Sequence, residues 1–117
     1  MDNCIFCNIV NGTSQIKPYL KNDDWIIISD KNAIAPEHML VISTKHDENL
    51  SQLSGRDRNY RIASAFDLIE EYVNEHDNQW ESGYRIVINT GKDAGQTVQH
   101  LHIHLLGGDQ LKNDFGT

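Results

Sequence analysis

The 117-residue sequence lacks long hydrophobic runs, clusters of basic residues and a leader-like N-terminal segment. No apolar run exceeds about five residues, whereas a bilayer-spanning helix needs about 20, so we expect no membrane partner. Seventeen Asp and Glu residues outnumber ten Lys and Arg, which argues against nucleic-acid binding because that affinity requires neutralised phosphates. Residues 1–9 lack the basic and apolar regions of a secretory signal, so we expect a cytoplasmic protein.

Proline and cysteine are also scarce. The two prolines, Pro18 and Pro36, mark turns rather than a linker, and no internal repeat is visible, so residues 1–117 are interpreted as one domain. The two cysteines, Cys4 and Cys7, form a C-x-x-C pair. In a chain without an export signal this spacing favours a metal or redox role over a structural disulfide.

Hydrophobic patterning predicts an α+β fold. Short apolar, β-branched runs predict strands, and apolar residues spaced by three and four predict one long helix that starts near Gly55. Ser54 and Asp57 are expected to form its capping box, and the charges from Arg56 to Arg61 its solvated face. A largely antiparallel sheet should pack this helix on one face. The predicted strands are residues 25–28, 39–42, 84–89 and 98–106, and the helix lies within 54–75.

Three histidines alternate with aliphatic residues between Gln99 and Leu105. In a strand, His100, His102 and His104 would share one face that borders an open cleft, and the aliphatic side chains would pack on the other face. The first and third rings would lie about 13 Å apart, too far to bind one metal ion together. A neighbouring pair could share a metal, or each ring could have a separate role along a substrate. An exposed, solvated set of histidines is the remaining alternative.

The loop from Asn89 to Thr97 directly precedes this strand. Its two glycines would let backbone amides approach an anion, and its Asn, Gln and Thr side chains can donate hydrogen bonds. The loop is therefore interpreted as a phosphate cradle, although a plain hairpin turn has a similar composition.

Residues 95–108, with sequence GQTVQHLHIHLLGG, resemble the signature of the histidine triad family. The resemblance continues through residues 4–9, 35–42 and 45–46, and the Leu106-Gly107-Gly108 ending is most similar to the nucleotide-binding phosphoramidase branch. It implies an antiparallel five-stranded sheet with one long helix, and a homodimer whose sheets join. It also implies hydrolysis of the P–N bond of purine nucleoside phosphoramidates, or of related adenylated compounds, with a nucleotide of the AMP or GMP type as ligand.

The same resemblance implies roles for individual residues. His102 corresponds to the nucleophile that forms a covalent nucleotidyl-histidine, with no metal required for the chemistry. His104 would contact phosphate, and Asp30 would bind the ribose hydroxyls. Supporting roles around the phosphate are implied for His38, His100, Asn89, Gly95, Gln96 and Thr97. Two departures from the family stand out: Lys31 replaces an apolar residue, and Ser43-Thr44 replaces a usual Pro-Lys pair.

The C-x-x-C pair has the spacing of zinc ligands, and a tetrahedral site needs two more. His46 and His100 are the candidates, since some histidine triad proteins hold a structural zinc with the equivalent residues. The alternative is two reduced cysteines, Cys4 and Cys7, packed as small apolar groups.

Three other functions remain open. A nucleotide-binding regulatory module would turn substrate over only incidentally. A metal-dependent hydrolase would use an adjacent histidine pair of the strand. A dinucleoside polyphosphate hydrolase belongs to a related branch, against which the Gly107-Gly108 ending counts.

Overall fold

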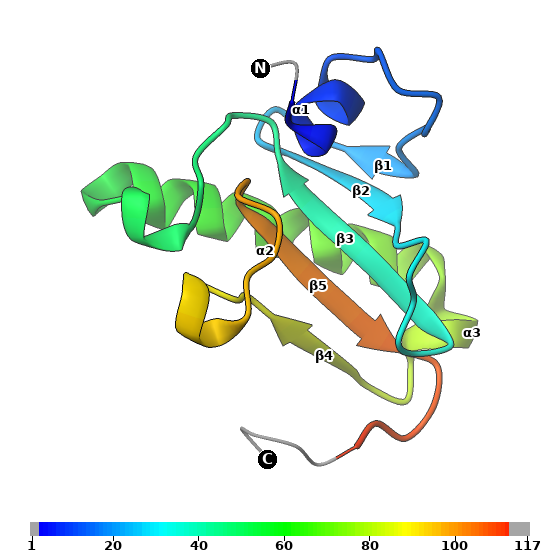
Figure 1. The fold of residues 1–117 in the computed structure, drawn as a ribbon. Helices are drawn as coiled ribbons and strands as arrows, with labels where there is room; N and C mark the ends of the chain where they lie inside the picture. Colours follow the sequence, from blue (N-terminus) through cyan, green and yellow to red (C-terminus); the bar gives the residue numbers. More distant parts are fainter. Residues whose placement is uncertain (1–2, 113–117) are drawn as a thin grey trace.

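The computed structural model describes residues 3–112 and confirms the predicted α+β architecture (Figure 1). Five antiparallel strands form one sheet in the order β1-β2-β3-β5-β4. Within these residues, no helix has the length and hydropathy needed to cross a membrane. The strands are β1 (Leu20–Lys21), β2 (Trp25–Ser29), β3 (Glu37–Ser43), β4 (Tyr84–Val87) and β5 (His102–Gly107), and the helices are α1 (Ile5–Val10), α2 (Gly55–Glu75) and α3 (Asp77–Trp80).

The two faces of the sheet are covered by different helices. On one face, alternate residues of β2, β3 and β5 pack against α2, with Trp25, Val41 and Ile103 fully buried. On the other face, the intervening residues of β2 and β3 form a smaller cluster with Phe6 and Ile9 of α1. Because both faces are covered, β2 and β3 are continuous apolar runs rather than alternating ones.

The long helix begins at Gly55, as predicted, but the proposed capping box is wrong. Ser54 makes no side-chain cap hydrogen bond. The Asp57 carboxylate instead lies 3.5 Å from the guanidinium of Arg61, one turn further along. Arg61 was expected on a solvated face, yet only 3% of it is exposed. Asp57 therefore faces a buried cation rather than the orphan amides of the first turn.

Strand β5 starts at His102, four residues later than predicted, because the preceding segment forms local hydrogen bonds. The amide of His100 donates to the Val98 carbonyl, at 2.9 Å, and the Gln96 side chain donates to the same carbonyl, at 3.0 Å. These bonds compete with the strand ladder. His100 thus lies just before β5 rather than within it.

The two glycines that follow Leu106 are required for different reasons. A Cβ atom on Gly107 would lie 2.7 Å from the Trp80 ring, and Gly108 has a φ angle of +89°. The end of β5 can therefore pass close to α3 and turn only with glycine at both positions.

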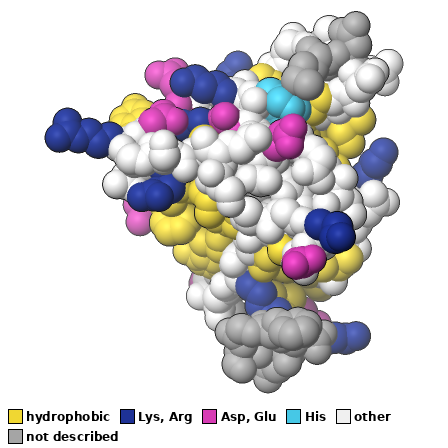
Figure 2. Space-filling model, turned by 60° about the vertical axis from the view of Figure 1, so that its left-hand side comes forward, with side chains coloured by type: hydrophobic (Ala, Val, Ile, Leu, Met, Phe, Trp, Pro, Cys, Tyr) yellow, Lys and Arg dark blue, Asp and Glu magenta, His cyan; other side chains and the backbone are white. Residues whose placement is uncertain are grey.

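The visible surface carries charges of both signs (Figure 2). Figure 2 shows a face on which acidic and basic side chains are scattered among one another, without a continuous basic area. This face offers no extended site for a polyanion.

Candidate functional site

A cavity of about 510 Å³ opens on the α1 side of the sheet, a size that suits a small organic ligand. Its apolar wall includes Phe6 and Ile9 of α1 and Ile28 of β2. Its polar wall includes Asp30, Lys31, Thr97, His102 and His104. The cavity therefore offers an apolar surface for a flat ring beside a cluster of imidazoles.

His102 lines the cavity while only 7% of it is exposed. Its Nδ1 atom lies 2.7 Å from the carbonyl oxygen of His100. A carbonyl only accepts, so the proton of the neutral ring is on Nδ1 and the lone pair is on Nε2. Burial lowers the pKa of His102, although the hydrogen bond to the His100 carbonyl and the Asp30 charge oppose this, and so favours the neutral ring. Phe6 packs edge-on against the ring, with 5.0 Å between ring centroids.

A second chain of hydrogen bonds fixes the tautomer of His104. The amide of Ile34 donates to Nδ1 of His38, at 3.1 Å, so the His38 proton is on Nε2. That Nε2–H lies 2.9 Å from Nδ1 of His104 and 3.2 Å from the Asp30 carboxylate. His104 therefore accepts on Nδ1 and carries its own proton on Nε2, where it can donate to a ligand.

Asp30, His38 and His104 could also be considered as metal ligands, because their ligand atoms lie within 4.8 Å of one another. The His38 tautomer argues against this. Its Nε2 carries the proton as long as Ile34 donates to Nδ1, and a protonated nitrogen cannot bind a metal. The cluster fits a hydrogen-bonded relay better than a metal site.

Burial and the neighbouring His102 and His38 rings lower the pKa of His104 to about 4, against 6.5 for an ordinary histidine. Between pH 6.5 and 4, His104 therefore binds a proton in the unfolded chain but not in the folded chain. We expect the free energy of unfolding to be unaffected by this group above pH 6.5 and to fall by about 2–3 kcal/mol between pH 6.5 and 4.

Urea denaturation of the intact chain and of His104→Asn at pH 7.5 and 4.5 checks this expectation. Asparagine can still accept the proton of His38 but does not titrate, so the variant should lose less stability on acidification. An equal loss in both proteins would contradict the assignment.

The loop from Asn89 to Thr97 uses more of its donors in internal hydrogen bonds than the phosphate-cradle hypothesis expects. The buried Gln96 side chain accepts from the Gly91 amide and donates to the Glu48 and Val98 carbonyls. The amides of Gly95 and Gln96 also donate within the loop. The structure places Asn89, Gly95 and Gln96 outside the residues that line the cavity.

Thr97 and Val98 do reach the cavity wall. Within residues 3–112, their backbone amides donate no hydrogen bond. Of the loop residues singled out in the sequence, Thr97 is therefore the one placed to contact a ligand, with the Val98 amide beside it.

Cys4, Cys7, His46 and His100 come together, with all four ligand atoms within 4.8 Å of one another. Nδ1 of His100 lies 3.3 Å from the Cys4 sulfur and 3.1 Å from Nδ1 of His46. The Cys7 sulfur lies 3.1 Å from the same His46 atom. Ligand atoms around a tetrahedral zinc are about 3.3–3.8 Å apart, given bonds of about 2.0–2.3 Å. The cluster is therefore close to zinc dimensions.

The tautomer of His100 suits metal binding. Its Nε2 lies 2.7 Å from the Ser43 carbonyl, so this atom carries the proton and the Nδ1 lone pair points to the cysteines. Burial and the neighbouring Cys4 raise the pKa of the Cys7 thiol, so thiolates at this place call for a nearby cation. The donor set and its spacing fit zinc.

The sequence analysis did not identify two residues that support the site, Phe6 and Arg61, and it did not decide how Lys31 affects the cavity. Phe6 packs on both His100 and His102, and its position between the two cysteines was the available signal. Arg61 is buried beside Ser43, which no periodic pattern indicated. Lys31 is exposed but still lines the cavity, so the departure noted at this position does alter the wall.

Together, the fold and the site define an antiparallel α+β protein with a histidine centre at the wall of a ligand-sized cavity. The HIT domain model matches residues 14–111, and the chain belongs to this family. The histidine triad resemblance is thus confirmed.

Relatives and solved structures agree. A HIT-like protein of Chlamydia trachomatis is 39% identical over 107 residues, which cover 92% of this chain and 94% of that protein. A histidine triad protein from Clostridium difficile superposes with a TM-score of 0.89 at 33% identity, covering 97% of this chain and 96% of its own. A HIT family hydrolase from Clostridium thermocellum gives a TM-score of 0.88 at 32% identity, covering 98% of both chains.

Proposed function

We propose that this protein is a nucleotide hydrolase that cleaves the P–N bond of purine nucleoside phosphoramidates through a covalent intermediate on His102. The observation that carries the proposal is the 2.7 Å contact from His102 Nδ1 to the His100 carbonyl, which leaves Nε2 as a free nucleophile on a ring that lines the cavity. The Clostridium thermocellum neighbour is described as a hydrolase, which supports the same class of activity.

In the first step, Nε2 of His102 attacks the α-phosphorus, a P–Nε2 bond forms and the P–N bond to the amine breaks. The His104 Nε2–H can donate a hydrogen bond to a phosphoryl oxygen, and the leaving nitrogen takes up a proton from solvent as it departs. The amides of Thr97 and Val98, which donate no hydrogen bond among the described residues 3–112, can donate to the phosphoryl oxygens as negative charge develops. The positive charge on His102 is stabilised through its Nδ1–H bond to the His100 carbonyl.

In the second step, water attacks the phosphorus, the P–Nε2 bond breaks, and the proton lost by the water is released to solvent, which balances the proton taken up by the leaving amine. The products are a nucleoside monophosphate and the regenerated neutral His102. Because burial lowers the pKa of His102, the ring is favoured to return to its neutral form after each cycle.

The nucleoside would lie along the apolar wall. Phe6, Ile9 and Ile28 provide a surface for the faces of a purine base, and Asp30, which lines the same cavity, can accept from ribose hydroxyls. We take the ligand to be a purine nucleotide of the AMP or GMP type, as the resemblance to the phosphoramidase branch implies.

We assign zinc to Cys4, Cys7, His46 and His100 as a structural ion. The ion would supply a fixed link between α1 and the segment that precedes β5, and not a reaction centre. Phe6 lies between the two cysteines and packs against His102, so this link also holds one wall of the cavity.

The proposal is tested by comparing hydrolysis of adenosine and guanosine 5′-phosphoramidates with that of a dinucleoside polyphosphate. We expect the phosphoramidates to be preferred in kcat/KM, and turnover to persist in the presence of a chelator. Tight nucleotide binding without turnover would support the regulatory module instead. A preference for the polyphosphate would support the related branch.

A further inference from the structure

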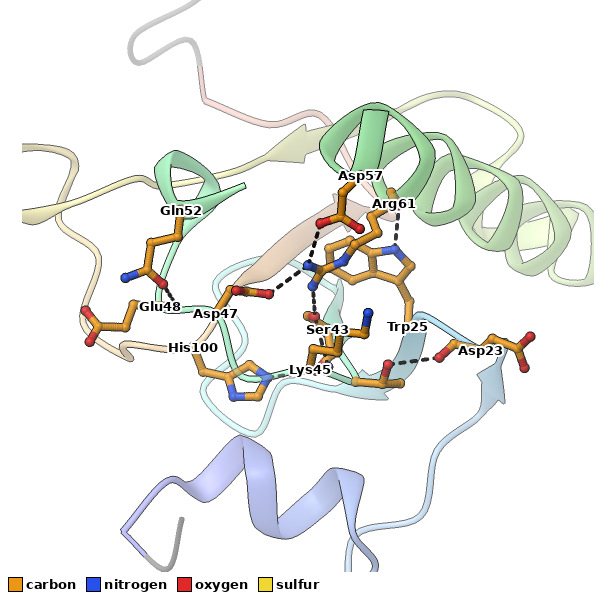
Figure 3. A network of polar contacts seen from close by, with 11 residues as sticks. Asp23, Trp25, Ser43, Lys45, Asp47, Glu48, Gln52, Asp57, Arg61 and His100 are labelled. Carbon is orange, nitrogen blue, oxygen red and sulfur yellow. Dashed lines mark hydrogen bonds and ion pairs between the residues drawn. The ribbon is translucent and has the colours of Figure 1, made fainter. Parts of the chain in front are cut away.

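Arg61 is a cation buried on the α2 side of the sheet, away from the cavity. Its Nη1 lies 2.7 Å from the Asp47 carboxylate, and its Nη2 donates to the Ser43 hydroxyl, at 2.7 Å (Figure 3). The backbone carbonyl of Arg61 accepts from the Trp25 indole, at 2.7 Å. Burying a charge is costly, and a buried ion pair alone is weak grounds for added stability. The arrangement therefore calls for another explanation.

Ser43 and Asp47 are the two ends of one short segment, and Arg61 joins them. The Ser43 carbonyl accepts from His100 Nε2, and the Asp47 carbonyl accepts from the Leu101 amide, both at 2.7 Å. The Ser43 amide donates to the Leu101 carbonyl, at 3.1 Å. Segment 43–47 thus holds residues 100 and 101 at three points.

The held residues are those that orient the nucleophile. The carbonyl of His100 accepts the Nδ1–H of His102, and this contact decides which nitrogen keeps its lone pair. A small rotation of the peptide at His100 would release that hydrogen bond. Three contacts of 2.7 Å therefore connect the Arg61 guanidinium, through Ser43 and His100, with the His102 ring.

We propose that Arg61 is a positioning residue for the reaction: by joining Ser43 to Asp47, it fixes the His100 backbone and thereby holds His102 in its nucleophilic tautomer. This inference rests on the proposed function for its kinetic consequence but not for its structural one. Arg61 itself touches neither the cavity wall nor the imidazole of His102. Segment 43–47 also contains His46, so the contacts of Arg61 with Ser43 and Asp47 help to position one candidate zinc ligand as well.

The test uses Arg61→Met, which removes the guanidinium, and Arg61→Lys, which keeps one charge but cannot contact both partners in the same way. Ser43→Ala is a milder variant, because it removes the hydroxyl and retains the carbonyl that holds His100. Arg58→Met is the matched control, since Arg58 is exposed on the same helix and contacts Asn59. Urea denaturation is used to find conditions under which every variant is folded. The zinc content of each variant is also measured.

We expect single-turnover nucleotidylation by Arg61→Met to be slower by about 10- to 100-fold, the range known for residues that orient a metal ligand. KM in steady-state turnover should change by less than about threefold. Arg61→Lys and Ser43→Ala should fall between this variant and the intact chain. The ¹⁵N shifts of the His102 imidazole should show a single Nδ1–H tautomer in the intact chain and a mixture in Arg61→Met.

Two results would overturn the inference: an unchanged His102 tautomer in folded Arg61→Met, or a rate no lower than that of Arg58→Met. The tautomer measurement needs no substrate. If the intact chain turns over no phosphoramidate, the proposed function fails while the spectra still decide the role of Arg61.

Discussion

Replacing His102 by alanine is expected to lower kcat for an adenosine 5′-phosphoramidate by roughly 10⁴-fold or more, because the proposed covalent intermediate forms on the ring that the variant lacks. KM should change little, since the apolar wall and Asp30 remain. The two constants are obtained from steady-state release of the amine product over a range of substrate concentrations.

His76→Ala is the control for the loss of one imidazole. His76 caps the end of α2 and stacks on Tyr72, with 4.2 Å between ring centroids, and it does not line the cavity. This variant should keep the kcat of the intact chain. If His102→Ala retains even a tenth of that kcat, His102 is not the nucleophile.

Removal of zinc is the second large expected effect. The purified protein should contain about one zinc per chain, and a chelator should lower the free energy of unfolding by about 3–5 kcal/mol, as expected for loss of an ion present far above its dissociation constant. The physical reason is that the ion links α1 to the segment before β5 through Cys4, Cys7, His46 and His100. Metal analysis and urea denaturation measure the two quantities.

Cys7→Ala separates a structural ion from a catalytic one. It should lose zinc and stability but keep kcat within about tenfold, measured where the variant is folded, because His102 and His104 do not belong to the Cys4, Cys7, His46 and His100 cluster. Abolished turnover in a folded, zinc-free protein would favour the metal-dependent hydrolase. Absence of stoichiometric metal from the intact protein would end the zinc hypothesis.

Local patterns were sufficient for most of the fold. The apolar runs of β2 and β3 are covered on both faces, so these patterns report burial directly. The three-and-four spacing of α2 correctly predicts burial of Ala65, Ile69 and Tyr72, whereas Phe66, which belongs to the same pattern, is 49% exposed. The five-stranded sheet was implied by the resemblance, and it is confirmed. The homodimer and the cytoplasmic location remain predictions.

Two features of the fold, the burial of Arg61 and the start of β5, depend on tertiary contacts that local sequence patterns do not reveal. Arg61 belongs by sequence to a charged stretch, and its burial depends on Ser43 and Asp47, which are distant along the chain. The late start of β5 depends on the hydrogen bonds of Gln96. Such contacts have no periodic signature, so composition and spacing could not reveal them.

The candidate site shows the same division. The sequence spacing predicted that His102 and His104 lie side by side, and their ring centroids are 5.1 Å apart. The proton positions, however, depend on the His100 carbonyl and the Ile34 amide. The nucleophile could thus be proposed from the sequence, whereas the reason for its orientation required the structure.

The central claim is that Nε2 of His102 becomes covalently bound to the nucleotide during turnover. Its most direct test is rapid acid quenching of the intact chain and of His102→Ala after mixing with a phosphoramidate labelled in the nucleoside, followed by mass analysis of the peptides. We predict one nucleoside monophosphate group on His102 in the intact chain and none in the variant. Label on a different residue, or equal label in the two proteins, would contradict the account.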